Sequence, residues 1–416
     1  MHDFVFRDDQ LYCEDVSLSQ IAEEAGTPCY VYSHKTLTDH YRKLNQAFQS
    51  VDHMVCYSVK SNSNLAVLDT LAKAGSGFDI VSGGELFRAL KVGADPRKIV
   101  FAGVGKTADE IEYALKNQIY FFTVESFPEL EEIDAVAQRM GKVANVAIRV
   151  NPDVDPKTHQ YTSTGKAENK FGLDMPKTIE AYQKALTLKG VRPMALHMHI
   201  GSQIVDTKPY QEAVKKIMPL ISKLKDMGVK LEALDIGGGL GIVYKEEAPS
   251  TAEDFAKTVL PLIKDLGLKI LVEPGRFIAG NAGALLTKVL YLKVNPVKNF
   301  VIVDAGMNDL IRPSLYGAYH EIIPVVKQPV ATVVSDVVGP ICESGDFFSK
   351  DRPLPAVEPG DILAIMSAGA YGFTMSSNYN TRPRACEVMV KGGQFSVVRE
   401  REVYEDLLKG EKTFSV

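Results

Sequence analysis

Short runs of β-branched and aromatic residues recur along the middle of the chain, each followed by a segment whose apolar positions have helical spacing. The runs have the length and two-residue period of strands, whereas the apolar residues between them recur every three or four positions. Eight strand-like runs occur, at 54–59, 78–81, 99–102, 120–124, 146–150, 195–200, 234–236 and 270–272. Helical segments lie at 65–74, 84–91, 108–116, 127–140, 179–188, 210–227 and 252–266.

This alternation predicts an α/β fold, and two architectures fit it. A (β/α)8 barrel and a doubly wound open sheet both alternate strands with helices. The count of eight strands favours the barrel. We therefore predict a (β/α)8 barrel over residues 31–280.

The pattern changes on both sides of the predicted barrel. Beyond residue 280 the strand-like runs follow one another without intervening helices and are bounded by Gly and Pro turns. They lie at 289–294, 300–303, 332–338, 361–366, 385–390 and 395–398. We predict a C-terminal β domain over 281–416 and expect N-terminal strands within residues 1–30 to join it.

One connection within the barrel, residues 151–174, is polar and too long for a plain turn. Loops of this length in a compact domain are usually binding segments or lids, although a mobile surface insertion has the same composition. We expect an active-site loop, with Lys170, Phe171 and Gly172 near its anchored end.

Composition and charge exclude several classes of partner. The chain has 416 residues, 45% of them hydrophobic and 24% charged, which is typical of a globular protein. A formal net charge of -5 provides no basic field for nucleic acid or an anionic membrane. No stretch approaches the ~20 apolar residues of a membrane helix, and the charged first residues contain no signal-peptide core. We expect a cytoplasmic protein.

The cysteine and histidine spacings do not indicate a metal site. The five cysteines are scattered, with no pair at C-x-x-C spacing, so neither a disulfide framework nor a zinc site is predicted. His197 and His199 share one face if both lie in a strand, but no carboxylate or third histidine falls at a ligand spacing. We predict no metal.

The first predicted strand ends at Lys60, directly before a polar turn. A lysine in that position either extends its amine to water or uses it to form a Schiff base with a carbonyl group. In a (β/α)8 barrel the functional residues lie at the carboxyl ends of the strands and in the loops that follow. Those positions hold Lys60, Asp79, Arg149, His199, Ser202, the glycine run 237–241, Glu273, Gly275 and Arg276.

The loops after the seventh and eighth strands are where barrels bind phosphate, because bare backbone N–H groups can approach an anion there. The run 237–241 lacks the G-x-G-x-x-G spacing of a dinucleotide fold, and glycine turns are often only structural. Followed by Gly275 and Arg276, it favours a phosphate site. Pyridoxal 5'-phosphate needs a lysine for its Schiff base, a cradle for its phosphate and a carboxylate for its ring nitrogen. One rim of the predicted barrel offers all three, with Glu273 as the carboxylate, and so predicts this cofactor. His199 then either lies flat against the ring or is an ordinary core histidine.

Five motifs in order along residues 27–398 resemble the fold-type III pyridoxal-phosphate decarboxylases, and within them most closely the diaminopimelate decarboxylases. The motifs are Tyr-Ser-Val-Lys-Ser-Asn (57–62), His-Ile-Gly-Ser-Gln (199–203), Gly-Gly-Gly-Leu-Gly-Ile (237–242), Glu-Pro-Gly-Arg (273–276) and Cys-Glu-Ser-Gly-Asp (342–346). The resemblance implies a barrel of the alanine-racemase type, a C-terminal β domain, and a homodimer with active sites completed across the interface. It also implies decarboxylation of meso-2,6-diaminopimelate to L-lysine and CO2, the last step of lysine biosynthesis.

The resemblance also implies roles for single residues. Lys60 is similar to the Schiff-base lysine, Glu273 to the partner of the pyridine nitrogen, and His199 to the residue stacked on the ring. Cys342 is similar to the thiol that returns a proton, donated by the neighbouring subunit. The implied cofactor-binding residues are Lys60, Asp79, His199, Ser202, Gly238, Gly239, Glu273, Gly275, Arg276 and Tyr371. The implied substrate-binding residues are Arg276, Arg312, Tyr316, Glu343 and Tyr371.

Two of these residues could instead have purely structural roles, and other functions fit the same fold. Cys342 can be a small buried hydrophobe, and Arg312 a surface charge. A decarboxylase for ornithine would resemble its relatives in carrying Asp where Glu343 stands, and would not need two arginines for a distal carboxylate. A racemase, a cofactor-free Schiff-base aldolase and a catalytically silent binding protein of this fold are further alternatives.

Overall fold

The computed structural model describes residues 2–155 and 170–414. The chain forms two compact units, one of Thr38–Ile242 with Glu247–Ile278, the other of Met1–Leu37, Val243–Glu246 and Ala279–Val416. Most of the predicted loop 151–174, namely 156–169, lies outside the described residues. Among the helices that are described, none has the length and apolarity needed to cross a membrane.

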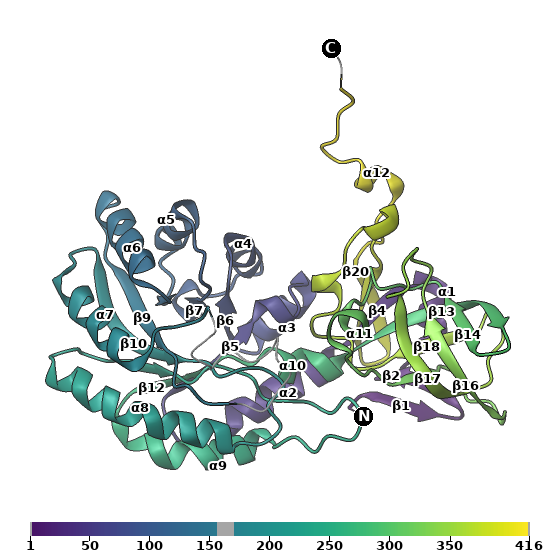
Figure 1. Ribbon diagram of the computed structural model, residues 1–416, viewed down its shortest axis with the longest axis horizontal. Coiled ribbons are helices and arrows are strands. Elements are labelled where there is room, and N and C mark those ends of the chain that lie inside the picture. Colours follow the sequence, from purple (N-terminus) through teal and green to yellow (C-terminus); the bar gives the residue numbers. More distant parts are fainter. Residues whose placement is uncertain (1, 156–169, 415–416) are drawn as a thin grey trace. The chain divides into compact units, whose positions relative to one another are not determined.

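The first unit is a closed barrel of eight parallel strands, which confirms the predicted architecture (Figure 1). Each strand pairs with the next along the chain, and the last pairs with the first. The strands are β5 (His53–Ser58), β6 (Gly77–Ile80), β7 (Ile99–Phe101), β8 (Phe121–Val124), β9 (Ala144–Val150), β10 (Val191–Met198), β11 (Ala233–Asp235) and β12 (Lys269–Val272).

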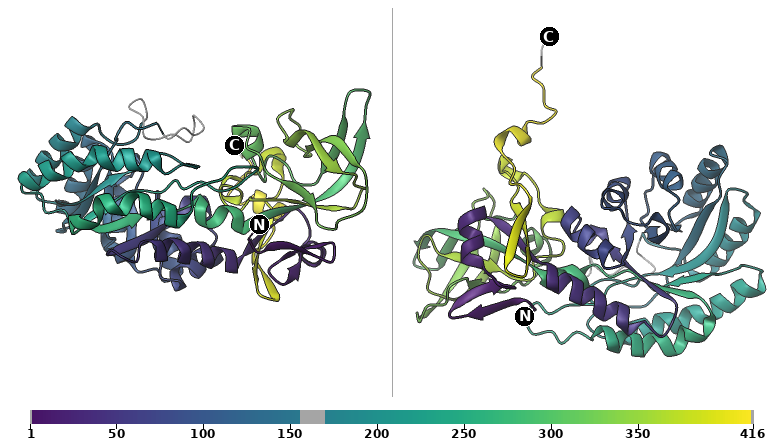
Figure 2. Two further views of the ribbon diagram at one scale, coloured as in Figure 1. Left: turned by 90° about the horizontal axis from the view of Figure 1, so that it is seen from below. Right: turned by 180° about the vertical axis from the view of Figure 1, so that it is seen from behind.

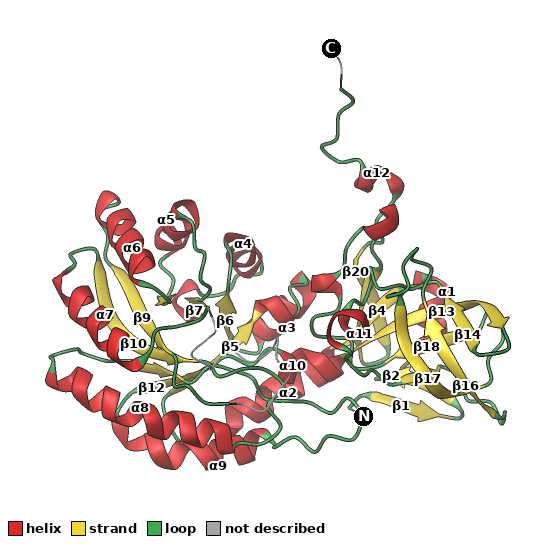
Figure 3. Cartoon of the chain, in the orientation of Figure 1, coloured by secondary structure: helices red, strands yellow, loops and turns green. Residues whose placement is uncertain are grey.

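Helices lie outside the barrel strands, one after nearly every strand (Figure 3). They are α2 (His34–Ala47), α3 (Leu65–Lys73), α4 (Gly83–Lys91), α5 (Ala108–Asn117), α6 (Phe127–Arg139), α7 (Met175–Thr187), α8 (Lys208–Asp226), α9 (Ala252–Ile263) and the short α10 (Arg276–Ala279). Six begin at a side-chain cap that accepts a backbone N–H, which satisfies a donor otherwise left without a partner. These caps are Asn64, Ser82, Thr107, Ser126, Asp174 and Thr251.

The barrel interior changes from apolar to polar toward the carboxyl ends of its strands. An apolar cluster draws residues from seven strands: Cys56, Val100, Phe121, Ala147, Met194 and Ala195, Ala233 and Leu271. Side chains two positions apart on a strand share a face. The next layer therefore holds Ser58, Ala102, Thr123, Arg149, His197, Asp235 and Glu273, and Asp79 joins it because it is paired with Ser58; all of them are buried. Burying so many polar groups is costly unless each has a partner or a ligand, which marks this end of the barrel as functional.

The second unit is mainly β-structure, as predicted (Figures 2 and 3). Its large sheet runs in the order β17-β16-β14-β13-β4-β19-β20, while β18 pairs with β13 and β15. The strands are β4 (Cys29–Ser33), β13 (Gly283–Val294), β14 (Asn299–Val303), β15 (Ile322–Pro324), β16 (Thr332–Val338), β17 (Phe347–Pro355), β18 (Ile362–Ile365), β19 (Cys386–Lys391) and β20 (Gln394–Arg399). Two short helices, α11 (Arg312–Tyr316) and α12 (Tyr404–Leu407), lie between and after them.

The N-terminal segment belongs to this second unit. β4 lies between β13 and β19, and β1 (Phe4–Arg7), β2 (Gln10–Cys13) and β3 (Val16–Ser17) form a small sheet of their own, followed by α1 (Leu18–Ala25). Leu11 and Ile21 share one apolar core with Leu286 and Val388. In both views of Figure 2 the N-terminal strands lie beside the strands of the C-terminal part.

Candidate active site

Lys60 lies in a 3-10 turn, Val59–Ser61, that follows β5 at the polar end of the barrel. Its Nζ donates a hydrogen bond of 2.7 Å to Oδ2 of Asp79, whose side chain is fully buried. The strand register explains this contact, because Ser58 is paired with Asp79 across β5 and β6. Burial, and then the charge of Glu273, raise the pKa of Asp79, whereas Lys60 opposes that shift. The lysine is therefore held beside a buried carboxyl group, although 39% of its side chain is exposed, and its role as the Schiff-base amine stays a prediction.

Glu273 follows β12 directly and is buried at the same level of the barrel. Its Oε2 lies 3.2 Å from Nε2 of His197 on β10. Burial alone would raise the pKa of Glu273, but His197 and Lys60 outweigh burial and lower it to about 2. Glu273 is thus an anion near neutral pH, as a partner for a protonated ring nitrogen must be.

His199 lies one residue beyond the end of β10, so it leaves the strand while His197 remains in the barrel interior. The condition under which the two histidines would share a strand face, that both lie in a strand, is therefore not met. Nδ1 of His199 accepts the N–H of Gly238 at 3.2 Å. Burial, and then the charges of Arg149 and Lys60, lower the pKa of His199 well below its usual value. A neutral, fixed imidazole is suited to lie against an aromatic ring.

The loops after β10, β11 and β12 pack backbone against backbone, and this packing requires glycine. A Cβ on Gly238 would lie 1.9 Å from the carbonyl oxygen of Glu273, and one on Gly239 would lie 2.1 Å from that of Gly201. This close backbone packing is enough to explain why glycine is needed at both positions. Binding of a phosphate group by these loops stays a prediction. Arg276, which is buried, lies beside Ser202, with Nη2 3.3 Å from the serine hydroxyl.

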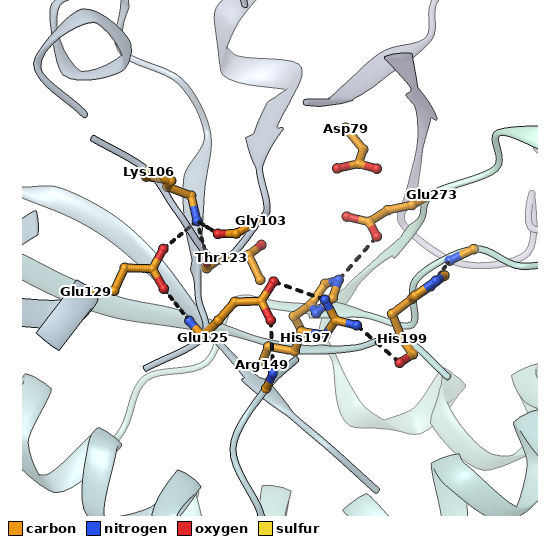
Figure 4. Close-up of polar contacts among 12 residues, drawn as sticks. Asp79, Gly103, Lys106, Thr123, Glu125, Glu129, Arg149, His197, His199 and Glu273 are labelled. Carbon is orange, nitrogen blue, oxygen red and sulfur yellow. Dashed lines mark hydrogen bonds and ion pairs between the residues drawn. The ribbon is translucent and has the colours of Figure 1, made fainter. Parts of the chain in front are cut away.

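A buried chain of ion pairs leads from the helix layer to this site (Figure 4). Lys106 donates to Glu129 at 2.6 Å and to the carbonyl oxygens of Gly103 and Thr123. Glu129 in turn accepts the backbone N–H of Glu125. Because both charged side chains are almost fully buried, this pair fixes the loop that follows β8.

Glu125 extends the chain of contacts to the site itself. Its Oε1 pairs with Nη1 of Arg149 at 3.0 Å, and its Oε2 accepts the N–H of Gly172. The Arg149 guanidinium also lies over the ring of Phe171, 4.8 Å from its centroid. Arg149 and the described end of the predicted loop are therefore held by one carboxylate.

The remaining predicted residues, Arg312, Tyr316, Cys342, Glu343 and Tyr371, lie in the second unit. Arg312 is buried, donates to Nε2 of His320 at 3.3 Å and lies between the rings of Tyr244 and Tyr316. The alternative of a surface charge is wrong for Arg312.

Cys342 begins an exposed turn, and its backbone N–H donates a hydrogen bond of 2.7 Å to Oδ1 of Asn380. Of the five cysteines, all within the described residues, it is the only exposed one. The buried-hydrophobe alternative is therefore wrong for this thiol.

Comparison with known proteins identifies the family. Residues 34–280 match the model of the pyridoxal-dependent decarboxylase, pyridoxal binding domain. A diaminopimelate decarboxylase of Aquifex aeolicus is 49% identical over 97% of this chain and 96% of its own, and one of Pseudomonas aeruginosa is 48% identical over 99% of each. The chain belongs to the diaminopimelate decarboxylase family. A crystal structure of the Helicobacter pylori enzyme complexed with L-lysine matches with a TM-score of 0.91 and 44% identity, over 94% of this chain and 98% of that one.

A member of this family uses pyridoxal 5'-phosphate, and the barrel fits that cofactor. The polar layer holds several buried atoms that have no hydrogen-bond partner among the described residues: Asp79 Oδ1, Thr123 Oγ1, His197 Nδ1, Asp235 Oδ2 and Glu273 Oε1. Such atoms are rare in folded proteins unless a ligand or water meets them. Lys60, with an amine, and Glu273, with an anion, lie at the same end of the barrel.

Sequence inspection missed some polar residues of the decarboxylase barrel, among them Lys106, Glu125, Glu129 and Asp235. Asp235 and Glu125 had a signal, since Asp235 ends a strand two residues before the glycine run and Glu125 directly follows β8. In the sequence, no carboxylate lies at a metal-ligand spacing from His197. The fold nevertheless places the carboxyl groups of Asp235 and Glu273 beside it. The absence of a metal stays a prediction.

Proposed function

We propose that this chain converts meso-2,6-diaminopimelate to L-lysine and CO2, with Lys60 and Glu273 as its central catalytic groups. The observation that carries the proposal is the hydrogen bond from Lys60 to buried Asp79 at the same level as the anionic Glu273. When bound, pyridoxal 5'-phosphate supplies an aldehyde for a Schiff base and a ring that accepts the electron pair left by CO2. The expected ligands of the cofactor are Lys60, Asp79, His199, Ser202, Gly238, Gly239, Glu273, Gly275, Arg276 and Tyr371.

The protein residues divide the remaining tasks. Lys60 would hold the cofactor through its amine, and Asp79 would keep that amine in place through the hydrogen bond between them. Glu273 keeps a proton on the ring nitrogen because its own pKa is far below neutral. His199, neutral and fixed by Gly238, would lie against the ring face. Together these groups lower the free-energy barrier to loss of the carboxylate below its value in solution.

Specificity depends on the far end of the substrate. We infer that Arg276 and Arg312 bind the distal carboxylate and that Glu343 binds the distal ammonium group, with Tyr316 and Tyr371 beside them. A planar guanidinium suits a carboxylate, and the rings of Tyr244 and Tyr316 hold the Arg312 guanidinium in a fixed orientation. Ornithine has no distal carboxylate and so offers the two arginines nothing to bind.

A substrate comparison tests this assignment. Purified protein with added pyridoxal 5'-phosphate is expected to release CO2 and L-lysine from meso-diaminopimelate. Its kcat/KM for this substrate should be at least about 10²-fold above that for ornithine, because ornithine leaves the buried arginines without a carboxylate partner. The measurement is CO2 release together with chromatography of the amine product. Faster turnover of ornithine, or isomerised substrate without CO2, would contradict the proposal.

We further propose that the protein is a cytoplasmic homodimer in which Cys342 of one subunit returns the proton at the site of the other. An exposed thiol in a polar turn is accessible for such a role. The test is mixing of Lys60→Ala with Cys342→Ala protein after reversible dissociation. Random reassociation should restore about a quarter of wild-type lysine formation, since half of the dimers are mixed and each then has one intact site of two.

The controls for the mixing experiment are the two variants, each taken alone through the same dissociation. Both are expected to stay nearly inactive. Recovery in either one alone, or no recovery in a mixture whose mixed dimers are verified by native mass spectrometry, would contradict sharing of the site between subunits.

A further inference from the structure

Three titratable side chains meet in the polar layer of the barrel: His197 on β10, Asp235 at the end of β11 and Glu273 just after β12. One nitrogen or oxygen atom from each lies within 4.8 Å of the others, and all three residues are buried. The register of the three strands brings these side chains together. His197 is paired with Asp235, and Asp235 is paired with Leu271, two residues before Glu273. The three side chains therefore project from one face of adjacent strands.

Two carboxyl groups this close and this deeply buried repel each other strongly when both are ionised. Their repulsion and the cost of desolvating two anions favour a single proton between them. The surroundings decide which group holds it. Glu273 faces His197, at 3.2 Å, and the positive charge of Lys60, both of which favour its anion.

Asp235 has a different environment. Its Oδ1 accepts the N–H of Gly237 at 2.8 Å, and its Oδ2 is buried with no hydrogen-bond partner among the described residues. The charged groups that influence it are Glu273 and Asp79, both negative. Burial, and then Glu273, raise the pKa of Asp235 well above its usual value. The surroundings of the two carboxyl groups therefore favour the proton on Asp235.

We propose that Asp235 is a neutral carboxylic acid that donates to Glu273 and, together with His197, holds that carboxylate as a weakly basic anion directed at the ring nitrogen of the cofactor. This inference rests on the role proposed for Glu273. Asp235 is a positioning residue that acts through Glu273. Hydrogen bonds to a carboxylate lower its affinity for protons, so the proton stays on the ring nitrogen and is not transferred to Glu273. Without the donor, Glu273 becomes more basic and takes that proton.

The first test is infrared spectroscopy of the protein near neutral pH. A protonated carboxylic acid gives a C=O band separate from those of carboxylates and amides. We expect the band of the wild-type protein to contain a component that is lost in Asp235→Asn, whose amide has the same shape and keeps a donor. Glu85 and Asp309, whose pKa burial raises to about 7, give components that this substitution leaves in place. A band that persists in Asp235→Asn and disappears in Glu273→Gln would place the proton on Glu273 and overturn the proposal.

The second test follows the ring nitrogen itself, in protein reconstituted with 15N-labelled pyridoxal 5'-phosphate. The 15N chemical shift is expected to show a protonated nitrogen in the wild type and in Asp235→Asn, and to move toward the neutral form in Asp235→Ala. We expect kcat to fall about tenfold in Asp235→Ala, as for loss of an outer-shell partner, with KM little changed and near-wild-type kcat in Asp235→Asn. An unchanged 15N shift in folded Asp235→Ala overturns the proposal.

The two tests separate failure of this inference from failure of the proposed function. If Glu273 does not contact the ring nitrogen, Glu273→Gln leaves the 15N shift unchanged, whereas the infrared band of Asp235 is still lost in Asp235→Asn. If Asp235→Ala does not fold, as judged by circular dichroism, the infrared result for Asp235→Asn alone decides where the proton lies.

Discussion

Replacing Lys60 with alanine is expected to lower kcat/KM for meso-diaminopimelate about 10⁴-fold, the upper range for loss of one catalytic residue. The structure gives the reason, since the Lys60 amine is positioned by Asp79 at the polar end of the barrel. Removal of the amine also leaves buried Asp79 without its only described cationic partner. The measurement is steady-state kinetics, together with mass spectrometry of protein reduced with borohydride, which should show a pyridoxyl adduct on Lys60 of the wild type.

The matched control for this experiment is Lys73→Ala. Lys73 is an exposed lysine paired with Asp69 one helical turn away, at the same 2.7 Å that joins Lys60 to Asp79. Exposed pairs of this kind contribute little, so kcat/KM should stay within about twofold of wild type. A borohydride adduct on another lysine, or full activity in Lys60→Ala, would remove the basis of the proposed site.

The barrel could be predicted because each βα unit has its own local signals. Strand periodicity, helical periodicity and a capping residue such as Asn64 or Ser126 recur unit after unit. Strands of the second unit depend on more distant partners. β17 (Phe347–Pro355) was missed because it contains polar residues and Pro353, which a strand tolerates at the end of a sheet, as here beside β16.

Part of the site could be predicted for the same reason. Lys60, His199 and Glu273 were found because a barrel gathers the carboxyl ends of its strands, whichever residues those ends contain. The contacts between His197, Asp235 and Glu273 could not be found in this way, because they depend on the register of three strands that are far apart along the chain. The contact of Lys106 with Glu129 likewise joins a loop to a helix 23 residues later.

Replacing Glu273 with glutamine is expected to lower kcat about 10²- to 10³-fold, the usual loss when one preorganised electrostatic group is removed from an active site. The amide keeps the shape of the carboxylate and can still accept from His197, so the packing of the buried layer is preserved. It carries no negative charge, so a proton on the ring nitrogen loses its stabilisation and the ring accepts the electron pair left by CO2 less readily. KM should change little, because binding depends on Lys60 and on groups at the far end of the substrate.

The measurement for Glu273→Gln is kcat and KM for meso-diaminopimelate at verified full occupancy by cofactor, which separates loss of chemistry from loss of binding. Glu112→Gln is the control, because Glu112 is a half-exposed carboxylate on α5, outside the buried layer, that pairs with Lys116 one helical turn away and with Arg139. We expect it to behave as the wild type. A Glu273→Gln variant with kcat within about twofold of wild type would show that the ring nitrogen needs no anion at this position. The pKa of about 2 at Glu273 would then reflect only the charges of His197 and Lys60 around a structural carboxylate. The polar end of the barrel would stabilise the reaction through Lys60 and His199.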